Sequence, residues 1–426
     1  MMKTMDYQNV RGTQDYLPEQ ELVRRKIRRT LEDTFIRYGC QPLETPILNE
    51  QRLMASKYAG GAEILKEMYC LSDRGKRDLT LRYDLTIPFA KVVGMNPQLS
   101  MPFKRYEIGK VFRDGPIKTG RLREFTQCDV DVVGVTSQAA EAELMMMAIE
   151  ALTQLKVDVV IQYNNRKLLY GLLQAFEVPE PFMNQVVLIL DKMEKIDRNT
   201  LVAELWNVQL TAPTIAQIEQ FLNEKPHISD LIKYENVNSW IDEGLMEIKE
   251  LIDYLEALGI EQKCVFNPFL ARGLDIYTGT IYELFLANGA IKSSIGSGGR
   301  YDRAIGGLIG NNESYPTVGI SFGLDVIYKA FELSGLVQQQ SDLDIYIIPI
   351  GTEKRALQLA TSLRQQGQRV LVEMNQRKVG KAMDKANREQ IPAVIVLGER
   401  EVENNRYALK NMVSGEVTEY EYTFNA

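Results

Sequence analysis

Residues 104–113 and 121–131 alternate polar and apolar side chains, and the segment between them contains Gly115, Pro116 and Gly120. This pattern predicts two antiparallel strands with a long connection. Successive side chains of a strand point to opposite faces, so the second strand should have an apolar face packed in the core and a polar face. The polar face carries one amide and two carboxylates, from Gln127, Asp129 and Asp131.

One interpretation of this polar face is the water-exposed side of an antiparallel sheet, which is common. The other is a binding site, which the neighbouring arginines favour. Arg113, Arg121 and Arg123 flank the two strands, and guanidinium groups match carboxylates and phosphates in a bidentate geometry. We therefore expect this sheet to bind an anionic group.

The length of 426 residues exceeds one ordinary domain, so roughly two or three domains are expected. The net charge of -7 argues weakly against a nucleic-acid partner, but net charge says little about local patches. Lys104–Arg123 holds seven Lys/Arg against two Asp/Glu, so a basic surface remains possible there.

Several classes of site are disfavoured by residue usage. The four cysteines are scattered without a CxxC pair, so neither a zinc site nor a disulfide framework is predicted, and no metal-ligating residues are assigned. The only histidine, His227, lies in a polar stretch and is expected at the surface. No signal-peptide pattern opens the chain and no apolar run is long enough to cross a membrane, which predicts a cytoplasmic protein without a membrane partner.

The periodicity along the rest of the chain predicts distinct regions. An apolar stripe at Val23, Ile27, Leu31 and Phe35 predicts a helix that begins near Pro18. Residues 42–48 read as an extended segment, and their prolines indicate a sheet edge or the start of a strand rather than a central strand. Residues 165–260 are helical in pattern and have little strand character. After a polar link at 338–342, a βαβαβ order predicts a small α/β domain with a mostly parallel sheet.

Residues 112–131 resemble motif 2 of the class II aminoacyl-tRNA synthetases, and the ending Gln-Cys-Asp-Val-Asp is similar to that of the histidyl-tRNA synthetase family. The resemblance implies that Arg113 holds the carboxylate of the amino acid and the α-phosphate of ATP. It also implies that Arg121 contacts ATP phosphates. Gln127 and Asp131 would bind the substrate histidine.

Two further segments carry histidine-binding residues by the same resemblance. Residues 82–88 are similar to the amino-group site, where Asp84 would meet the ammonium and Thr86 would offer a hydroxyl. Residues 294–302 match a glycine-rich loop of the family, whose tyrosine, here Tyr301, lines the histidine pocket.

The segment 270–283 resembles the signature that distinguishes histidyl enzymes from other class II synthetases. Arg272 would then be catalytic, because a fixed cation stabilises charge that develops on a phosphoryl group under attack. Tyr277 would offer its hydroxyl to the imidazole. The family more often has Tyr-Tyr where this chain has Ile276-Tyr277. Strand alternation predicts that these two side chains face opposite ways, so that Ile276 need not touch the substrate.

Residues 316–325 match the start of class II motif 3, in which Gly319 and Gly323 would let ATP lie against the strand. The motif normally continues with Glu-Arg, and its arginine binds the γ-phosphate. This chain has Asp325-Val326 instead. Loss of such a contact is expected to weaken ATP binding or slow activation by roughly ten- to a hundredfold.

The resemblance implies an α+β fold. A class II catalytic domain with an antiparallel sheet would span 1–164 and 261–335, with a helical insertion at 165–260 and an α/β anticodon-binding domain at 342–426. It implies ATP-dependent ligation of L-histidine to tRNA(His), with Mg²⁺ accompanying the nucleotide, and a homodimer.

Two other interpretations stay open. One is a histidine-binding paralogue with impaired catalysis, such as the regulatory subunit of ATP phosphoribosyltransferase. Val326 favours it, and Arg113, Arg121 and Arg272 oppose it. The other is a prolyl or threonyl class II synthetase, which the 270–283 signature opposes.

Overall fold

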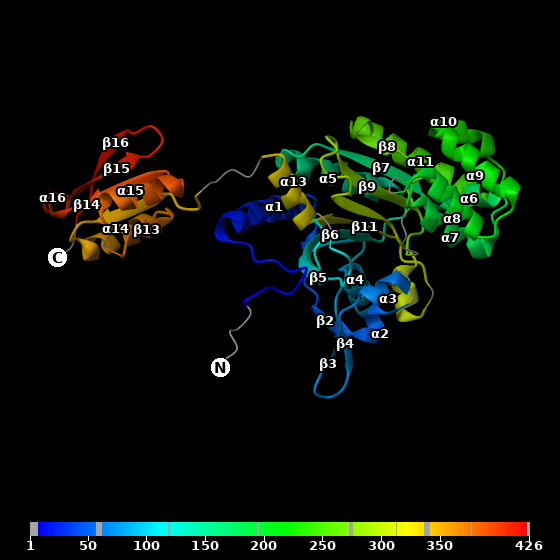
Figure 1. The fold of residues 1–426 in the computed structure, drawn as a ribbon, viewed down its shortest axis with the longest axis horizontal. Coiled ribbons are helices and arrows are strands. Elements are labelled where there is room, and N and C mark those ends of the chain that lie inside the picture. The colour runs from blue at the N-terminus through cyan, green and yellow to red at the C-terminus, as the bar shows by residue number, and fades with distance from the viewer. Residues whose placement is uncertain are drawn as a thin grey trace. The chain divides into compact units, whose positions relative to one another are not determined.

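The structure, a computed structural model, describes residues 7–56, 62–117, 120–193, 196–271, 276–311, 313–335, 341–375 and 377–423. It divides into two compact units, one built on Arg24–Ser334 and one on Gly335–Ala426. The larger unit contains a mixed sheet that is mostly antiparallel, and the smaller contains a separate sheet (Figure 1). The predicted α+β fold is confirmed.

The sheet of the larger unit has eight strands in the order β1-β5-β6-β11-β10-β9-β7-β8. Their bounds, in that order, are Gln41–Pro42, Phe103–Phe112, Glu124–Val133, Thr317–Gly323, Gly296–Arg300, Thr280–Leu286, Val159–Asn165 and Cys264–Phe266. Only the outermost pairs, β1 with β5 and β7 with β8, are parallel. The predicted antiparallel pair is β5 and β6, which match Phe103 to Val133 through Phe112 to Glu124.

Helices cover one face of this sheet. They are α1 (Pro18–Arg37), α5 (Ala139–Gln154) and α13 (Leu324–Leu333). The apolar stripe of α1 is buried at Ile27, Leu31 and Phe35, and the Phe35 ring stacks on Phe322 of β11. Cys128, Val130 and Val132 of β6 are buried as predicted. The opposite, polar face of β6 is thereby left for the site.

A smaller sheet and short helices border the site. The sheet has the order β2-β4-β3, with bounds Leu48–Glu50, Asp78–Leu81 and Cys70–Ser72. The helices are α2 (Gln51–Met54), α3 (Ala62–Glu67), α4 (Thr86–Met95) and α12 (Ala304–Ile309). Ile309 of α12 packs directly on Gly94 of α4.

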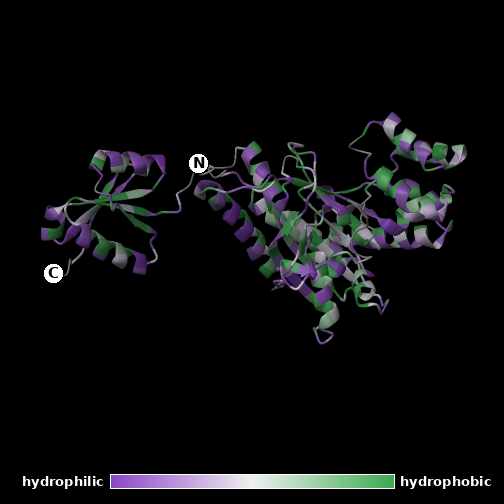
Figure 2. Cartoon of the chain, turned by 60° about the horizontal axis from the view of Figure 1, so that its bottom comes forward, coloured by the Kyte–Doolittle hydropathy of each residue, from purple (hydrophilic) through white to green (hydrophobic). Residues whose placement is uncertain are grey.

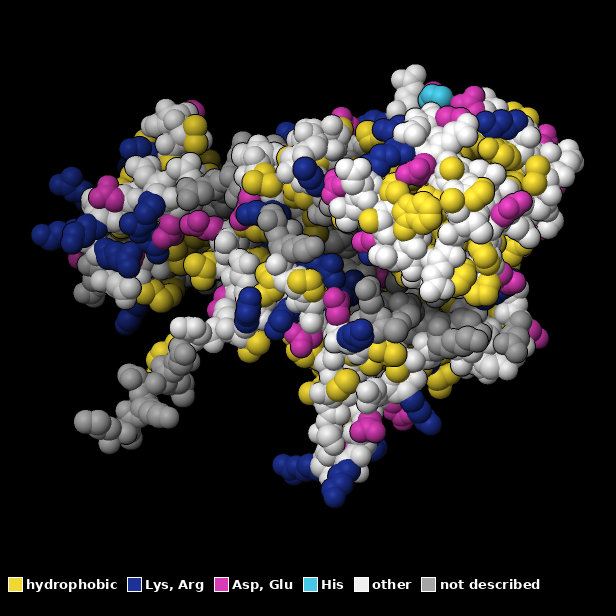
Figure 3. All heavy atoms as spheres, turned by 45° about the vertical axis from the view of Figure 1, so that its right-hand side comes forward, with side chains coloured by type: hydrophobic (Ala, Val, Ile, Leu, Met, Phe, Trp, Pro, Cys, Tyr) yellow, Lys and Arg dark blue, Asp and Glu magenta, His cyan; other side chains and the backbone are white. Residues whose placement is uncertain are grey.

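The segment between β7 and β8 is helical, with no strand among its described residues. Its elements are α6 (Arg166–Ala175), α7 (Glu180–Leu190), α8 (Arg198–Asn207), α9 (Ala212–Glu224), α10 (Ile228–Leu231), η1 (Ile232–Tyr234), α11 (Ser239–Ala257) and η2 (Glu261–Lys263). Gly171 and Gly244 let α6 and α11 approach closely. His227 precedes α10 at the surface, as predicted (Figure 3).

The smaller unit has the strand order β13-β12-β14-β15-β16. Its elements are β12 (Ile345–Pro349), α14 (Glu353–Gln365), β13 (Val370–Val372), α15 (Val379–Arg388), β14 (Ala393–Leu397), α16 (Glu399–Glu403), β15 (Arg406–Asn411) and β16 (Val417–Glu421). The first three strands are parallel, as predicted, and the antiparallel pair β15–β16 was not predicted. α14 and α15 pack on opposite faces of the apolar central strands (Figure 2).

None of the described helices is both long and apolar enough to cross a lipid bilayer.

Candidate active site

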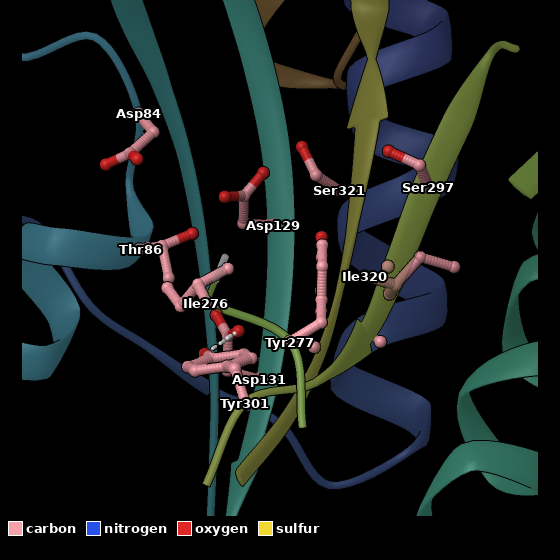
Figure 4. A pocket seen from close by; sticks show the side chains of 13 residues that line it. Asp84, Thr86, Asp129, Asp131, Ile276, Tyr277, Ser297, Tyr301, Ile320 and Ser321 are labelled. Atoms are coloured by element: carbon pink, nitrogen blue, oxygen red, sulfur yellow. Dashed lines mark hydrogen bonds between the residues drawn. The ribbon is translucent and has the colours of Figure 1, made fainter. Parts of the chain in front are cut away.

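A pocket lies on the polar face of the large sheet (Figure 4). Its walls come from the loop before α4 and that helix's start, from β6, β10 and β11, and from residues near β9 and β10. The lining residues are Asp84, Thr86, Asp129, Asp131, Ile276, Tyr277, Ser297, Gly298, Gly299, Tyr301, Gly319, Ile320 and Ser321. The pocket therefore gathers six of the residues predicted from the resemblance, although they lie far apart in the chain.

Three carboxylates give the pocket an acidic character. Burial raises the pKa of Asp84 to about 6, and hydrogen bonds from backbone groups of α4 oppose that shift. Burial raises the pKa of Asp129 to about 8, and the charge of Arg105 opposes it. Burial also raises the pKa of Asp131, again against Arg105. A cationic ligand would relieve this accumulation of buried negative charge.

Asp131 already has partners on both of its oxygens. The Tyr301 hydroxyl donates to Oδ1, and Nη2 of Arg105 lies 2.6 Å from Oδ2. Arg105 is fully buried beneath the pocket, with its guanidinium over the ring of Phe89 at 4.5 Å. The predicted histidine-binding residues Asp131 and Tyr301 are thus hydrogen-bonded to each other, and Arg105 forms an ion pair with the Asp131 carboxylate.

Gln127 lies next to the pocket rather than in its wall. Its Nε2 donates to Oγ of Ser321 on the neighbouring strand β11 at 2.8 Å. Ser321 is the register partner of Asp129, and its side chain opposes the rise in the pKa of that carboxyl. Gln127 therefore reaches the pocket through Ser321, which faces Asp129 directly across the strand pair.

Ile276 and Tyr277 both line the pocket, so the prediction that they face opposite ways is wrong. That prediction assumed a strand from Asp275, whereas β9 begins at Thr280. Residues 276–279 form a turn and its continuation, where strand alternation does not apply. Ile276 is a wall of the pocket.

The resemblance predicted a loop at residues 294–302, but part of this segment is a strand. Residues Gly296–Arg300 form β10, in the middle of the sheet between β9 and β11. A Cβ on Gly298 would lie 2.1 Å from the Gly319 carbonyl oxygen and 2.7 Å from the Tyr282 ring. These glycines reflect close packing within a strand rather than a turn.

The two predicted phosphate-binding arginines lie outside the pocket wall. Nε of Arg113 donates to the Tyr83 carbonyl at 2.9 Å, and its guanidinium lies over the ring of Phe125. Burial lowers the pKa of Arg113, and the charge of Asp84 opposes that shift. Arg121 is exposed and lies 3.4 Å from Glu67. Arg272, the other predicted catalytic residue, lies outside the described residues.

Gly319 and Gly323 stand on β11, but their surroundings differ from the expectation. A Cβ on Gly319 would lie 1.9 Å from Oδ1 of Asp131, so the carboxylate occupies the space over this glycine. At Gly323 the nearest side chain is Val326, 3.1 Å from the Cβ position. Packing inside the protein therefore explains both glycines, and the predicted ATP contacts remain a prediction.

The residues that replace the Glu-Arg pair have separate structural settings. Asp325 is buried, accepts a 2.5 Å bond from Nη1 of Arg24 and accepts from the backbone N–H of Thr126. Val326 is partly exposed. It lies 3.5 Å from the Cβ position of Gly120, a residue of the connection that precedes β6. An apolar contact stands where the resemblance places an arginine.

Among the described residues, no group of three or more His, Cys, Asp or Glu side chains is arranged to hold a metal ion.

Comparisons with known proteins show the family to which this chain belongs. The family model described as histidyl-tRNA synthetase matches residues 12–327, and the one described as anticodon binding domain matches residues 344–423. The chain belongs to the histidyl-tRNA synthetase family. Histidine–tRNA ligase 2 of Shouchella clausii is 56% identical over 99% of this chain and 100% of the relative. Histidine–tRNA ligase 1 of Bacillus thuringiensis is 54% identical over 96% of this chain and 97% of the relative.

Solved structures show the same relationship. The histidyl-tRNA synthetase of Nostoc sp. PCC 7120 superposes with a TM-score of 0.84 at 27% identity, covering 98% of this chain and 97% of that one. An ATP phosphoribosyltransferase regulatory subunit/histidyl-tRNA synthetase from Bacillus halodurans C reaches 0.78 at 18% identity, covering 93% and 100%, which shows the shared fold alone. The ligase assignment is therefore confirmed, and the regulatory alternative is not better supported.

Sequence reasoning assigned no role to Arg105, Asp129, Ser321 or Ile276. The alternation in β6 placed Asp129 on the same face as Gln127 and Asp131, and this signal could have identified it. Arg105 carried no comparable signal, because its complete burial results from packing between α4 and β6.

Proposed function

We propose that this family member joins L-histidine to tRNA(His) in two ATP-dependent steps. The carboxylate of histidine attacks the α-phosphorus of ATP, the bond to pyrophosphate breaks, and histidyl-adenylate forms. A hydroxyl of the 3′-terminal adenosine of the tRNA then attacks the carbonyl carbon, and AMP leaves. Mg²⁺ arrives with the nucleotide.

The observation that carries the proposal is an acidic pocket bordered by a cation. Asp84 and Thr86 stand at one wall to receive the ammonium, and Asp131, Tyr277 and Tyr301 stand where the imidazole would bind. Gln127 supports this wall through Ser321. A zwitterionic amino acid with a polar ring matches this distribution, since its carboxylate would be directed toward Arg113, whose charge acts on Asp84.

The arginines would supply electrostatic stabilisation. Arg113 would hold the carboxylate and α-phosphate, Arg121 the outer phosphates, and Arg272 the charge that develops on the α-phosphate. Preorganised cations at developing charge usually contribute the largest share of catalysis in phosphoryl chemistry. Gly319 and Gly323 would border the nucleotide.

We also propose the division into a catalytic domain at 1–164 with 261–335, a helical insertion at 165–260 and a tRNA-binding domain at 342–426. Exposed cations at Arg377, Lys378 and Lys381, near and on α15, would meet phosphates of the tRNA. A cytoplasmic homodimer is part of this proposal.

The test is histidine-dependent ATP–pyrophosphate exchange, with proline and threonine as controls. Exchange with histidine alone supports the proposal. Histidine binding without exchange would instead favour the non-catalytic paralogue, the candidate that the aliphatic contact of Val326 with Gly120 favours.

A further inference from the structure

Tyr277 reaches the pocket from a short segment that belongs to no strand. Residues 277–279 precede β9, which begins at Thr280. Figure 4 shows Tyr277 extending from this segment into the pocket, and its ring packs closely on β10, since a Cβ on Gly299 would lie 2.9 Å from it. Because no strand ladder fixes residues 277–279, their position depends on bonds to other elements.

One side of this segment is bound to the end of β10. The N–H of Thr278 donates to the Arg300 carbonyl at 2.8 Å, and Oγ1 of Thr278 accepts from the N–H of Asp302 at 3.0 Å. Arg300 is itself fixed, because its guanidinium donates two bonds to the Glu141 carboxylate, at 2.6 and 2.8 Å. A buried ion pair therefore holds this side of the segment.

The other side of the segment contacts the start of α6 and a helix of the insertion, α11. The N–H of Arg166 donates to the Gly279 carbonyl at 2.9 Å, and Asn165, the last residue of β7, pairs with Thr280. Asn165 and Thr280 are fully buried. Nδ2 of Asn165 donates to Oε2 of Glu247 on α11 at 2.6 Å and reaches Oγ1 of Thr280 at 3.4 Å. The Glu247 carboxylate is thus linked to the segment through one buried amide.

Glu247 is held firmly in this place. Its Oε1 lies 2.7 Å from Nζ of Lys167, and its Oε2 lies 3.3 Å from the Cβ position of Gly279. The helix that carries it packs tightly on α6, because a Cβ on Gly244 would lie 2.5 Å from the backbone N of Leu168. The Glu247 side chain is only 14% exposed. A carboxylate with this burial and these partners can fix the backbone beside it.

We propose that Glu247 is a positioning residue of the pocket, which holds residues 277–280 so that Tyr277 faces the ligand. Of the described residues that line the pocket, none belongs to the helical insertion, so the insertion would contribute to histidine binding indirectly. The inference rests on the proposed function, because it takes histidine as the ligand and the Tyr277 hydroxyl as a contact of its imidazole. It adds a residue that lies outside the pocket wall.

The test is the Kd of histidine, measured by calorimetric titration of the full-length chain and its variants. Glu247→Ala should raise this Kd about fivefold or more, because the segment loses a charge-assisted hydrogen bond that fixes it. Glu243→Ala is the matched control. Glu243 lies one turn earlier on α11 and binds the same Lys167 at 2.9 Å from an exposed position, so its loss should change the Kd less than about twofold. An equal rise for both variants would overturn the proposal.

A double-substitution cycle gives a readout that a merely structural role would not change. Tyr277→Phe removes the hydroxyl through which Glu247 is proposed to act. In the Tyr277→Phe protein, Glu247→Ala should therefore raise the Kd of histidine less than about twofold further. The same fold-rise with and without the Tyr277 hydroxyl would show that Glu247 acts independently of Tyr277, which would contradict the proposal.

The KM for ATP in pyrophosphate exchange should stay within about twofold in Glu247→Ala, because the segment contacts the histidine pocket. Equal rises in the KM values for ATP and histidine would mean a general loss of the site and would overturn the proposal. If Glu247→Ala does not fold, Glu247→Gln replaces it. This variant keeps the side-chain volume and should raise the Kd of histidine about twofold or more, because a charge-assisted bond becomes a neutral one. An unchanged Kd in Glu247→Gln would then overturn the proposal.

The same titrations separate this inference from the proposed function. If the unsubstituted protein binds no histidine, the proposed function fails. If it binds histidine and Glu247→Ala binds it equally well, only this inference fails.

Discussion

Asp129 lies in the pocket wall and is buried from water. Its ionised carboxylate should therefore lower the free energy of unfolding. Its pKa is raised by burial to about 8, far above the ordinary value of 3.8 for the unfolded chain. Between these pH values the folded state binds more protons than the unfolded state, so this group destabilises the fold as pH rises from about 4 to 8. Such a residue is better explained by function than by folding.

We therefore predict that Asp129→Asn raises the melting temperature relative to the unsubstituted protein, and by more at pH 8 than at pH 5. The amide cannot ionise, so the penalty that grows with pH is removed. Thermal unfolding of both proteins at the two pH values measures this. A difference in melting temperature that is the same at pH 5 and pH 8 would show that ionisation of Asp129 has no part in it.

Val326 is the other residue that separates this chain from the family pattern. Its side chain packs between Gly120 and Gly323 and offers no charge to a phosphate. We predict that Val326→Arg lowers the KM for ATP in pyrophosphate exchange by roughly tenfold or more, since a charge-assisted phosphate contact is added. Val326→Leu is the apolar control, and an equal effect of both substitutions would exclude a phosphate contact.

Arg272 has the most direct expected role in the chemistry. We predict that Arg272→Ala slows adenylate formation at least about a hundredfold, because a fixed cation at the α-phosphate is lost. Single-turnover adenylate formation is the measurement, and native mass should show the same oligomeric state for both proteins. Near-normal activity would remove Arg272 from the mechanism.

At the scale of elements, β10 shows how closely the strands that border the pocket are packed. Its glycines let the Tyr282 side chain lie over the strand, and the Tyr282 hydroxyl donates to the Gly319 carbonyl at 2.9 Å. The backbone of β10 and β11 thereby borders the pocket directly. A side chain on the wrong position of β10 would push these strands apart.

Gly298→Ala should consequently destabilise the larger unit by about 1–3 kcal/mol or more, because its Cβ would lie 2.1 Å from a backbone oxygen. Gly296→Ala is the matched control in the same strand, since its nearest contact is 3.0 Å from the added carbon. Denaturant unfolding measures both. A smaller loss for Gly298→Ala than for Gly296→Ala would show that the strand relaxes around the added methyl.

At the scale of the whole molecule, the two compact units should contribute different steps of the reaction. The pocket residues belong to the larger unit, and the exposed cations near α15 belong to the smaller one. Under the proposed function, activation of histidine uses residues of the larger unit, whereas charging also requires the tRNA to bind. The two assays therefore report on different units.

We predict that the double substitution Arg377→Ala/Lys381→Ala raises the KM for tRNA(His) severalfold and flattens its dependence on salt, because phosphate contacts are lost. Histidine-dependent pyrophosphate exchange should stay within about twofold. Lys354→Ala is the control, because α14 packs on the opposite face of the same sheet. A loss of charging by Lys354→Ala equal to that of the double variant would place tRNA binding elsewhere.

The sequence by itself determined what depends on local spacing. The alternation of β6 assigned its two faces, the four-residue stripe assigned the buried side of α1, and the βαβαβ order after residue 342 predicted the parallel strands of the smaller sheet. The resemblance then brought together residues from Asp84 to Tyr301, because motifs preserve chemistry across long separations. These features follow from neighbours in the chain.

Only the tertiary structure decided which of these polar groups already have hydrogen-bond or ion-pair partners inside the protein. β6 pairs with β11, almost two hundred residues later in the chain, and this pairing puts Ser321 opposite Asp129 and Asp131 over Gly319. The same packing buries Arg105 against Asp131 and leaves Oδ1 of Asp129 without a hydrogen-bond partner in the part of the chain that the structure describes. Such partners cannot be predicted from the spacing of residues, because hydrogen bonding and burial depend on strands that meet only in the folded sheet.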